Sequence, residues 1–297
     1  MTRIAFIGLG NMGGPMAGNL AGAGHAVVGF DLASESCAAA AASGVVIAEN
    51  ARAAVEGAEI VITMLPAGRH VRAVWSEIIP VLAPGSLLID CSTIDVENAR
   101  AVHALAAAAG LSALDAPVSG GVGGAKAATL TFMVGGTEAA FAAGQPVLAA
   151  MGKRIVHCGA AGAGQAAKIC NNMILGISMI AVCEAFVLAE KLGLSHQALF
   201  DVASTSSGQC WSRTSYCPVP GPVPASPANN AYRPGFAAAL MLKDLRLSQE
   251  AAGAAGAATP LGATATELYA RFAEHAADTD FSGIIAMLRD SGAANAP

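Results

Sequence analysis

The sequence has 297 residues, of which 54% are hydrophobic and only 12% charged, and its formal net charge is -5. This composition excludes collagen-like, intrinsically disordered and disulfide-scaffold proteins, and the length suffices for one large or two moderate domains. The 16 Lys and Arg are outnumbered by 21 Asp and Glu. Nucleic-acid binding is therefore not expected, because affinity for phosphate comes mainly from clustered positive charge.

The cysteines are scattered, and they form neither a Cys-x-x-Cys pair nor a cluster with histidines at metal-ligand spacing. We interpret them as reduced thiols of a cytoplasmic protein and expect no metal site. A strand-like segment begins at Ile4, with no signal-peptide pattern before it. The seven cysteines are Cys37, Cys91, Cys158, Cys170, Cys183, Cys210 and Cys217.

In the first half of the chain, short apolar runs alternate with alanine-rich helical stretches. This alternation is typical of a doubly wound parallel sheet covered by helices. The predicted strands are 4–7, 26–30, 60–64, 87–89, 111–114, 130–134 and 155–157. The predicted helices are 12–23, 35–42, 71–79 and 96–109.

After about residue 160 the strand signals vanish and long apolar helices dominate. The first of these is predicted over 163–192, and at about 1.5 Å per residue it is about 45 Å long, enough to join two domains. We place the boundary near Gly162, between an α/β domain (1–162) and an all-helical domain (163–297). The apolar stretch 173–189 contains Glu184 and is shorter than the roughly 20 residues of a membrane span, so we expect a buried core helix and no membrane contact.

The segment 217–234 holds six of the 14 prolines and is predicted to be a stiff loop. Two interpretations of this loop remain open. It is either a plain connector or a flap on the substrate side, since long loops in compact domains are often functional.

A glycine-rich motif follows the first predicted strand and opens the first helix. Its residues are Gly8, Leu9, Gly10, Asn11, Met12 and Gly13. In the pattern Gly-x-Gly-x-x-Gly the first glycine makes a tight turn, the second lets the backbone approach a pyrophosphate, and the third allows close packing of helix and strand. Because Asp31 ends the next strand about 20 residues later, the context is that of a dinucleotide-binding site.

Asp31 also predicts which dinucleotide is bound. A carboxylate here accepts hydrogen bonds from the adenosine ribose and repels a 2′-phosphate, while Leu32 and Ala33 offer no cation to hold one. We therefore expect NAD rather than NADP. The alternative is that Asp31 only caps the next turn.

Residues that follow later strands lie at the same carboxyl edge of the predicted sheet, where α/β proteins bind ligands. We expect them to line the nicotinamide side of the cofactor. They are Met64, Leu65, Pro66 and Thr93.

The whole chain, from Ile4 to about Arg289, resembles the 3-hydroxyisobutyrate dehydrogenases of the β-hydroxyacid dehydrogenase family. Four motifs carry this resemblance, in the same order and at similar separation. They are 8–16 (GLGNMGGPM), 115–121 (DAPVSGG), 164–172 (GQAAKICNN) and 242–244 (LKD).

The resemblance implies a Rossmann-type domain followed by an all-helical domain that often mediates dimer or tetramer formation. It also implies roles for individual residues. Lys168 is then the catalytic residue, Asn172 orients the substrate, and Lys243 lies near cofactor and substrate. Ser119, Gly120 and Gly121 are implied to bind the substrate carboxylate.

The residues themselves support these roles. Lys168 lies in the first turns of the long helix, where the positive end of the helix dipole and burial both favour a neutral amine that can accept a proton. Asn172 is four residues further on, on the same helix face. Ser119 and the two glycines after it offer backbone N–H groups to an anion. Trp211 and Phe236 are candidates for the wall of a small substrate pocket, although aromatic residues more often belong to a core.

The leading hypothesis is therefore NAD-dependent oxidation of (S)-3-hydroxyisobutyrate to methylmalonate semialdehyde, a step of valine catabolism. One alternative is a related β-hydroxyacid dehydrogenase, or a reductase of tartronate semialdehyde, succinic semialdehyde or glyoxylate. Another is a non-catalytic NAD-binding module. The sequence leaves open which small β-hydroxy acid is the substrate and whether the protein forms homodimers or homotetramers.

Overall fold

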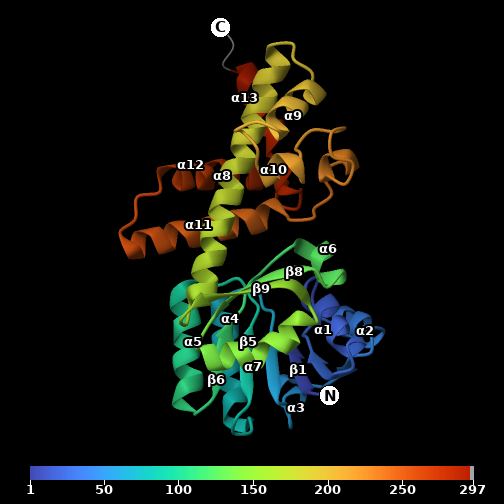
Figure 1. The fold of residues 1–297 in the computed structure, drawn as a ribbon, viewed down its shortest axis with the longest axis vertical. Coiled ribbons are helices and arrows are strands. Elements are labelled where there is room, and N and C mark those ends of the chain that lie inside the picture. The colour runs from blue at the N-terminus through green and yellow to red at the C-terminus, as the bar shows by residue number, and fades with distance from the viewer. Residues whose placement is uncertain (295–297) are drawn as a thin grey trace. The chain divides into compact units, whose positions relative to one another are not determined.

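The computed structural model describes residues 1–294, which form two compact units (Figure 1). The first unit is Met1–Lys168 and the second begins at Ile169. The division falls inside helix α8 (Ala163–Lys191) and not at Gly162, because the first turns of this helix pack against the first unit. Each unit has a hydrophobic core of its own.

The first unit is built on one nine-stranded sheet in the order β3-β2-β1-β4-β5-β6-β8-β7, with β9 paired to β8. Strands β1 to β6 are parallel and have the strand order of a dinucleotide-binding fold, 3-2-1-4-5-6. They are β1 (Arg3–Ile7), β2 (Ala26–Phe30), β3 (Val46–Ile47), β4 (Ile60–Thr63), β5 (Leu87–Asp90) and β6 (Ser112–Asp115).

The remaining strands depart from the predicted all-parallel sheet. Strand β8 (Leu130–Gly135) runs antiparallel to both β6 and β7 (Val118–Ser119), and β9 (Gly152–Gly159) is parallel to β8. Only residues 120–129, which include the six-residue helix α6 (Gly121–Lys126), lie between β7 and β8, and this is too little chain for the crossover that a parallel pair requires. Helix α7 (Glu138–Ala149) provides that crossover between β8 and β9.

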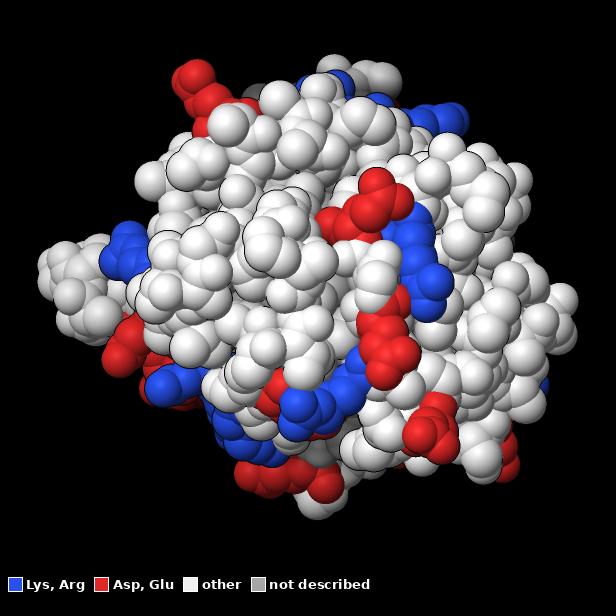
Figure 2. Space-filling view, turned by 90° about the horizontal axis from the view of Figure 1, so that it is seen from below, with Lys and Arg blue, Asp and Glu red and all other residues white. Residues whose placement is uncertain are grey.

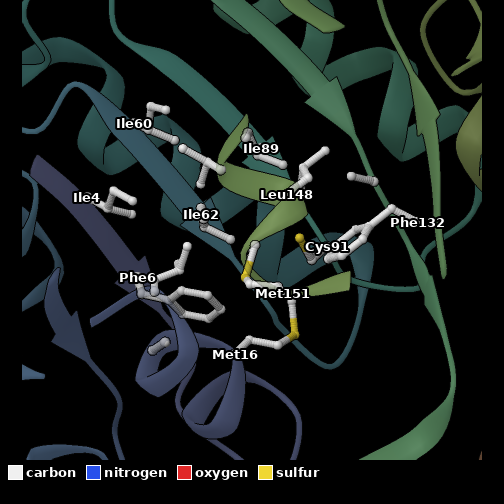
Figure 3. Close-up of a cluster of buried hydrophobic side chains, with 14 of the residues drawn as sticks. Ile4, Phe6, Met16, Ile60, Ile62, Ile89, Cys91, Phe132, Leu148 and Met151 are labelled. Carbon is white, nitrogen blue, oxygen red and sulfur yellow. The ribbon is translucent and has the colours of Figure 1, made fainter. Parts of the chain in front are cut away.

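Helices cover both faces of the sheet (Figure 1), so successive residues of the central strands enter two different cores. On one face, Phe6 and Ile62 pack with Met16 of α1 and with Leu148 of α7 (Figure 3). On the other face, Trp75 of α4 is completely buried. The other helical elements of this unit are α1 (Gly13–Gly22), α2 (Ser34–Ala41), α3 (Ala51–Ala54), α4 (Gly68–Ile78), η1 (Ile79–Val81) and α5 (Val96–Ala108).

The described part of the second unit is helical, as predicted, and its only β contact is an isolated bridge between Ala237 and Asp280. Phe186, Tyr269 and Phe281 are among the fully buried side chains of its core. Besides α8, the helical elements are α9 (His196–Ser204), α10 (Trp211–Thr214), η2 (Pro227–Asn230), α11 (Ala238–Ala255), α12 (Pro260–Ala276), η3 (Phe281–Gly283) and α13 (Ile284–Ala294).

Helix α8 contributes Met179, Cys183 and Phe186 to the core of the second unit, as predicted, but it is buried on one face only. Its inner face packs through Gly176 against Met241 and Leu245 of α11, but Ile174 is 64% and Leu188 58% exposed. Among the described helices it alone is long and apolar enough to cross a bilayer, and 44% of its most apolar stretch is buried. Between residues 173 and 189 of this helix Ser178 and Glu184 are the polar side chains, so the sequence alone does not mark which face is covered.

The proline-rich segment 217–234 is a loop with one turn of 3₁₀ helix, η2, which the proline count did not predict. Two side chains of the segment stabilise it by hydrogen bonds to carbonyl groups of the same segment. The Ser226 hydroxyl donates to the Cys217 carbonyl at 2.5 Å, and the Tyr232 hydroxyl donates to the Pro218 carbonyl at 2.8 Å.

The surface carries few charges. On the face in Figure 2, Lys and Arg lie beside Asp and Glu within a largely uncharged surface, and no large patch of one sign is visible.

Candidate active site

The glycine turn after β1 is tightly packed except at one point. Gly8 has a φ of +96°, and a Cβ there would collide with the carbonyl oxygen of Met64. A Cβ on Gly13 would collide with the carbonyl oxygen of Gly8, whereas Gly10 has nothing within 4 Å of its would-be Cβ. This is the pattern that a pyrophosphate requires, since the first and third glycines close the turn and the second leaves room for the ligand. The turn therefore fits a dinucleotide.

Asp31, at the end of β2, is fixed by two backbone groups. Its Oδ2 accepts a hydrogen bond from the Leu9 N–H at 2.6 Å, and its Oδ1 accepts one from the Ala33 N–H at 2.8 Å. The carboxylate thus caps the turn before α2 and also ties the glycine turn to β2. Each oxygen keeps acceptor capacity for a ribose hydroxyl. Leu32 is 94% exposed, while the Leu9 side chain is buried in the core.

The residues after β4 and β5 are joined by a hydrogen-bonded chain. The Leu65 N–H donates to the Ser92 Oγ at 2.7 Å, and the Ser92 hydroxyl donates to the Asp90 Oδ1 at 2.6 Å. The glycine turn contacts the same edge, because Gly8 lies against Met64. The structure therefore gathers the motif, Met64 and Leu65 at the carboxyl ends of β1 and β4, where the strand order reverses and α/β proteins bind ligands. Pro66 and Thr93 directly follow Leu65 and Ser92.

Asp90 is a buried carboxyl group that the sequence analysis did not single out. Thr63 Oγ1 donates to its Oδ1 at 2.7 Å, but its Oδ2 has no hydrogen-bond partner. Burial raises the pKa of Asp90 to about 6, against the opposing effect of hydrogen bonds from Ser92 and Thr63. This group therefore exchanges a proton in the range where enzymes are usually assayed.

Lys168 is only 7% exposed and ends the first unit. The helix turn before it is anchored twice. Asp115, at the end of β6, accepts the N–H of Gly162 at 2.8 Å and the N–H of Gln165 at 3.0 Å. The Gln165 side chain accepts the Ile94 N–H at 3.1 Å and donates to the Ser92 carbonyl at 2.7 Å. Asp115 and Gln165 lie in two motifs that the sequence analysis identified, but it assigned them no role.

The segment with Ser119, Gly120 and Gly121 connects β7 to α6. Gly120 has a φ of +133° and Gly121 a φ of +61°, a backbone conformation that glycine adopts without strain. Ser119 is half-buried and paired to Thr131 on β8, while Gly120 is exposed. The backbone N–H groups of this turn are consistent with an anion-binding role.

In the second unit the structure brings Asn172 together with the 243–244 pair of α11. Asn172 is 2% exposed, and its Nδ2 donates to the Asp244 Oδ2 at 2.5 Å. Its Oδ1 accepts a hydrogen bond from the Asn171 Nδ2 at 3.0 Å, so the orientation of the amide is fixed. Lys243, a site residue predicted from the sequence, is half-buried, and Asp244 beside it is a residue for which no role was predicted.

Trp211 and Phe236 belong to one aromatic cluster. Trp211 is 52% exposed and stacks on Tyr216 at a centroid distance of 5.0 Å, and Tyr216 stacks on Phe281 at 5.3 Å. Phe236 meets Phe281 edge to face at 5.7 Å. The cluster therefore includes core residues as well as an exposed tryptophan.

A buried carboxyl group, Asp280, organises this cluster. Its Oδ2 accepts hydrogen bonds from the Tyr216 hydroxyl at 2.8 Å and from the N–H groups of Gly235 at 2.9 Å and Phe236 at 3.1 Å. Burial and the neighbouring Asp280 raise the pKa of the Tyr216 hydroxyl, which therefore stays protonated and donates.

Among the described residues, no group of three or more His, Cys, Asp or Glu side chains is arranged to hold a metal ion. All seven cysteines are free.

Comparison with known proteins extends over nearly the whole chain. A model of the NAD binding domain of 6-phosphogluconate dehydrogenase matches residues 3–159. A model described as NAD-binding of NADP-dependent 3-hydroxyisobutyrate dehydrogenase matches residues 162–288. The chain is 57% identical over 289 residues to a probable 3-hydroxyisobutyrate dehydrogenase of Mycobacterium tuberculosis, covering 97% of this chain and 98% of the relative.

Two further proteins bear on the substrate. An NAD-dependent L-serine dehydrogenase of Pseudomonas aeruginosa is 46% identical over 286 residues, covering 95% of this chain and 96% of that protein. The solved structure of the M. tuberculosis 3-hydroxyisobutyrate dehydrogenase with L-serine superimposes with a TM-score of 0.95, covering 97% of this chain and 99% of that one. The chain therefore belongs to the 3-hydroxyisobutyrate dehydrogenases of the β-hydroxyacid dehydrogenase family, and it is a dehydrogenase with a nicotinamide-dinucleotide-binding domain.

Proposed function

We propose that this protein oxidises (S)-3-hydroxyisobutyrate to methylmalonate semialdehyde with NAD, as a step in valine catabolism. The observation that carries the proposal is the buried Lys168 on an anchored helix turn, in a chain that is 57% identical to a probable 3-hydroxyisobutyrate dehydrogenase. When bound, NAD supplies the acceptor for the hydride that leaves the alcohol carbon. The residues of the chain then have to hold the substrate and take the hydroxyl proton.

We assign the proton transfer to Lys168. A buried amine is pushed toward its neutral form, which can accept the proton of the substrate hydroxyl. In the reverse direction the ammonium donates the proton and stabilises negative charge on the carbonyl oxygen.

Asn172 is assigned to orient the substrate. One amide hydrogen is used by Asp244 and the carbonyl oxygen by Asn171, so the second amide hydrogen is the donor available for a substrate oxygen. Ser119, Gly120 and Gly121 are assigned to the substrate carboxylate, Lys243 to the cofactor, and Trp211 and Phe236 to the apolar part of the substrate.

The preference for NAD rests on Asp31 and Leu32. The carboxylate of Asp31 is held in place by Leu9 and Ala33, where it attracts ribose hydroxyls and repels an added phosphate. The exposed Leu32 provides no positive charge to counter this repulsion. Dinucleotide contacts are further assigned to Asn11, Met12, Met64, Leu65, Pro66 and Thr93.

A second candidate substrate is L-serine. It differs from 3-hydroxyisobutyrate by an ammonium in place of a methyl group, and both the L-serine dehydrogenase and the solved structure with L-serine are close relatives. A site lined by apolar residues favours the methyl compound, because an ammonium loses its hydration there without a partner.

The test is NADH formation at 340 nm with 3-hydroxyisobutyrate, L-serine, 3-hydroxypropionate, glycerate and 4-hydroxybutyrate, each with NAD and with NADP. We expect kcat/KM to be at least about tenfold higher for 3-hydroxyisobutyrate with NAD, a difference of about 1.4 kcal/mol. A higher value for L-serine would replace the substrate assignment, and a higher value with NADP would replace the cofactor assignment. No turnover with intact NAD binding would favour a non-catalytic module.

We also propose that the protein is a homo-oligomer in the cytoplasm. The exposed apolar face of α8, with Ile174 and Leu188, fits the same face of a second copy, because a surface of this kind is costly to leave in water. Seven free cysteines suit a reducing compartment. Light scattering of the purified protein in detergent-free buffer tests this, and a monomer, or a protein that requires detergent, would contradict it.

A further inference from the structure

The start of helix α8 is fixed by a carboxylate that is distant in sequence. Asp115 ends β6 and is 1% exposed. It accepts the backbone N–H groups of Gly162 and Gln165, which are 47 and 50 residues further along the chain. These N–H groups belong to the first turn of α8 or immediately precede it, where a helix leaves its donors unpaired. Asp115 therefore caps α8 from a neighbouring strand.

Two glycines approach this carboxylate closely. A Cβ on Gly135 would lie 2.5 Å from Asp115 Oδ1, and a Cβ on Gly164 would lie 2.9 Å from Asp115 Oδ2. The two glycines bring β8 and α8 into direct contact with the acid. Asp115 thus lies directly against the start of the helix that carries Lys168 three residues after Gln165.

The charge of Asp115 opposes the effect of the helix terminus on Lys168. The positive end of a helix dipole favours a neutral amine, as burial does. A carboxylate at the same terminus favours the ammonium form, because opposite charges attract in a buried environment.

We propose that Asp115 is a positioning residue for Lys168, which anchors the first turn of α8 and sets the pH at which the lysine gives up its proton. The proposal rests on the assignment of Lys168 as the proton acceptor. Gln165 is the second part of this anchor, since its side chain binds the 92–94 loop at two atoms and carries no charge.

Other titratable or charged groups surround Asp115 and have to be considered in any pH experiment. His103 Nε2 on α5 lies 3.0 Å from Asp115 Oδ1, and the Arg100 side chain passes beside Gly162. The charge of Asp115 contributes to the raised pKa of two groups. These are Asp90, the register partner of Asp115 on β5, and Cys158 on β9. The hydrogen bonds to the backbone N–H groups of Gly162 and Gln165 come from Asp115.

The first experiment compares the pH dependence of kcat for 3-hydroxyisobutyrate oxidation in the wild type and in Asp115→Asn. Oxidation needs the neutral amine, so activity rises with pH through the lysine pKa. Removal of the negative charge favours the neutral amine, and we expect the acidic limb to move to lower pH by about 0.5–1 unit. A limb that stays in place in the folded variant, together with an unchanged Lys168 pKa, would overturn the proposal.

Asp90→Asn is the matched control, because it removes a carboxyl that is equally buried and in register with Asp115 but does not cap α8. We expect a smaller shift of the limb than in Asp115→Asn. A limb that disappears in Asp90→Asn and does not move in Asp115→Asn would assign it to Asp90 and refute the proposal.

A second variant, Gln165→Leu, tests the anchor without a change in charge. We expect kcat to fall by about tenfold or more with the acidic limb unmoved, since misplacement of a catalytic group costs rate. Wild-type kcat would contradict the positioning role. This variant also keeps the proposal testable if Asp115→Asn does not fold, and NAD can be added to stabilise either variant.

Direct titration of the lysines separates this proposal from the proposed function. The chain has five lysines, Lys126, Lys153, Lys168, Lys191 and Lys243, so ¹³C-labelled lysine NMR is tractable, with Lys168→Arg to assign the signal. A lower Lys168 pKa in Asp115→Asn, without a matching shift of the kinetic limb, would support the coupling and disprove the catalytic role of Lys168. An unchanged Lys168 pKa would disprove the coupling itself.

Discussion

Each unit contains a buried carboxylate that holds backbone N–H groups distant in sequence, but the two carboxylates organise different things. Asp115 binds the first turn of a helix, 47 and 50 residues away. Asp280 binds the N–H groups of Gly235 and Phe236, 45 and 44 residues away, and also the Tyr216 hydroxyl. The first therefore anchors the helix turn that precedes the proposed proton-transfer residue, and the second anchors residues of an aromatic cluster.

The difference follows from the architecture of each unit. In the first, parallel strands end side by side, so polar side chains at the strand ends can reach a helix terminus. In the second, the segment 217–234 carries few backbone hydrogen bonds of its own, and the Asp280 carboxylate binds the residues that flank it, Tyr216, Gly235 and Phe236. Substitutions in the first unit should therefore change chemistry and cofactor choice, and substitution of Asp280 should change stability.

The largest effect is expected for Lys168→Ala. Loss of a general base lowers kcat by about 10²–10⁴-fold, while NAD binding, measured by calorimetry, should change little because the glycine turn and Asp31 are untouched. Full turnover in this variant would remove Lys168 from the mechanism and leave the first unit with a purely structural carboxylate.

Asp280→Ala should cost stability rather than chemistry. The change leaves the N–H groups of Gly235, Phe236 and Ser282 without their acceptor, and we expect the free energy of unfolding to fall by about 3–5 kcal/mol in urea titrations. Tyr216→Phe, which removes one donor and keeps the ring stacking, should cost only about 1 kcal/mol. Equal losses in the two variants would mean that the carboxylate itself contributes little.

Asp90 predicts a pH dependence of stability. Burial raises its pKa to about 6 from the ordinary value of 3.8, so between these pH values the folded chain binds more protons than the unfolded chain. Its contribution to stability therefore falls as the pH rises from about 4 to 6, by roughly 3 kcal/mol in all. Urea titrations at a series of pH values should show that Asp90→Asn lacks this decline, and parallel curves for the two proteins would contradict the raised pKa.

The smallest effect concerns cofactor choice. Asp31→Ala combined with Leu32→Arg removes the carboxylate that repels a 2′-phosphate and adds a cation to bind one. We expect the ratio of kcat/KM for NAD to that for NADP to fall by at least about tenfold, or about 1.4 kcal/mol. A ratio equal to that of the wild type would show that Asp31 serves only to cap the turn before α2.

Local patterns were sufficient to predict most of the first unit. Alternating apolar and helical stretches located β1, β2, β4 and β5 to within one or two residues, because strands buried on both faces are short apolar runs. Strand β7 was not predicted, because two residues are too few to show an alternating pattern. The antiparallel pairing of β8 was not predicted either, because it depends on the number of residues between β7 and β8.

The site was predicted in the same uneven way. Gly8, Gly10 and Gly13 carry a local signal, since their roles depend on neighbours in the same turn and in the adjoining strand. Asp115 carries no local sequence signal. Its hydrogen-bond partners lie almost 50 residues away, and any buried acid at a strand end has the same sequence pattern. The exposed face of α8 was missed for a related reason: a helix that is apolar all round does not show which side is covered.

The two tryptophans lie in different units and in opposite surroundings. Trp75 is completely buried and its indole N–H lies 3.3 Å from Thr63 Oγ1, whereas Trp211 is half-exposed and stacked on Tyr216. Their fluorescence should accordingly differ in wavelength and in access to a quencher such as iodide. Each unit of this chain therefore carries its own intrinsic optical reporter, and a Trp211→Phe variant would allow the melting of the first unit to be followed alone.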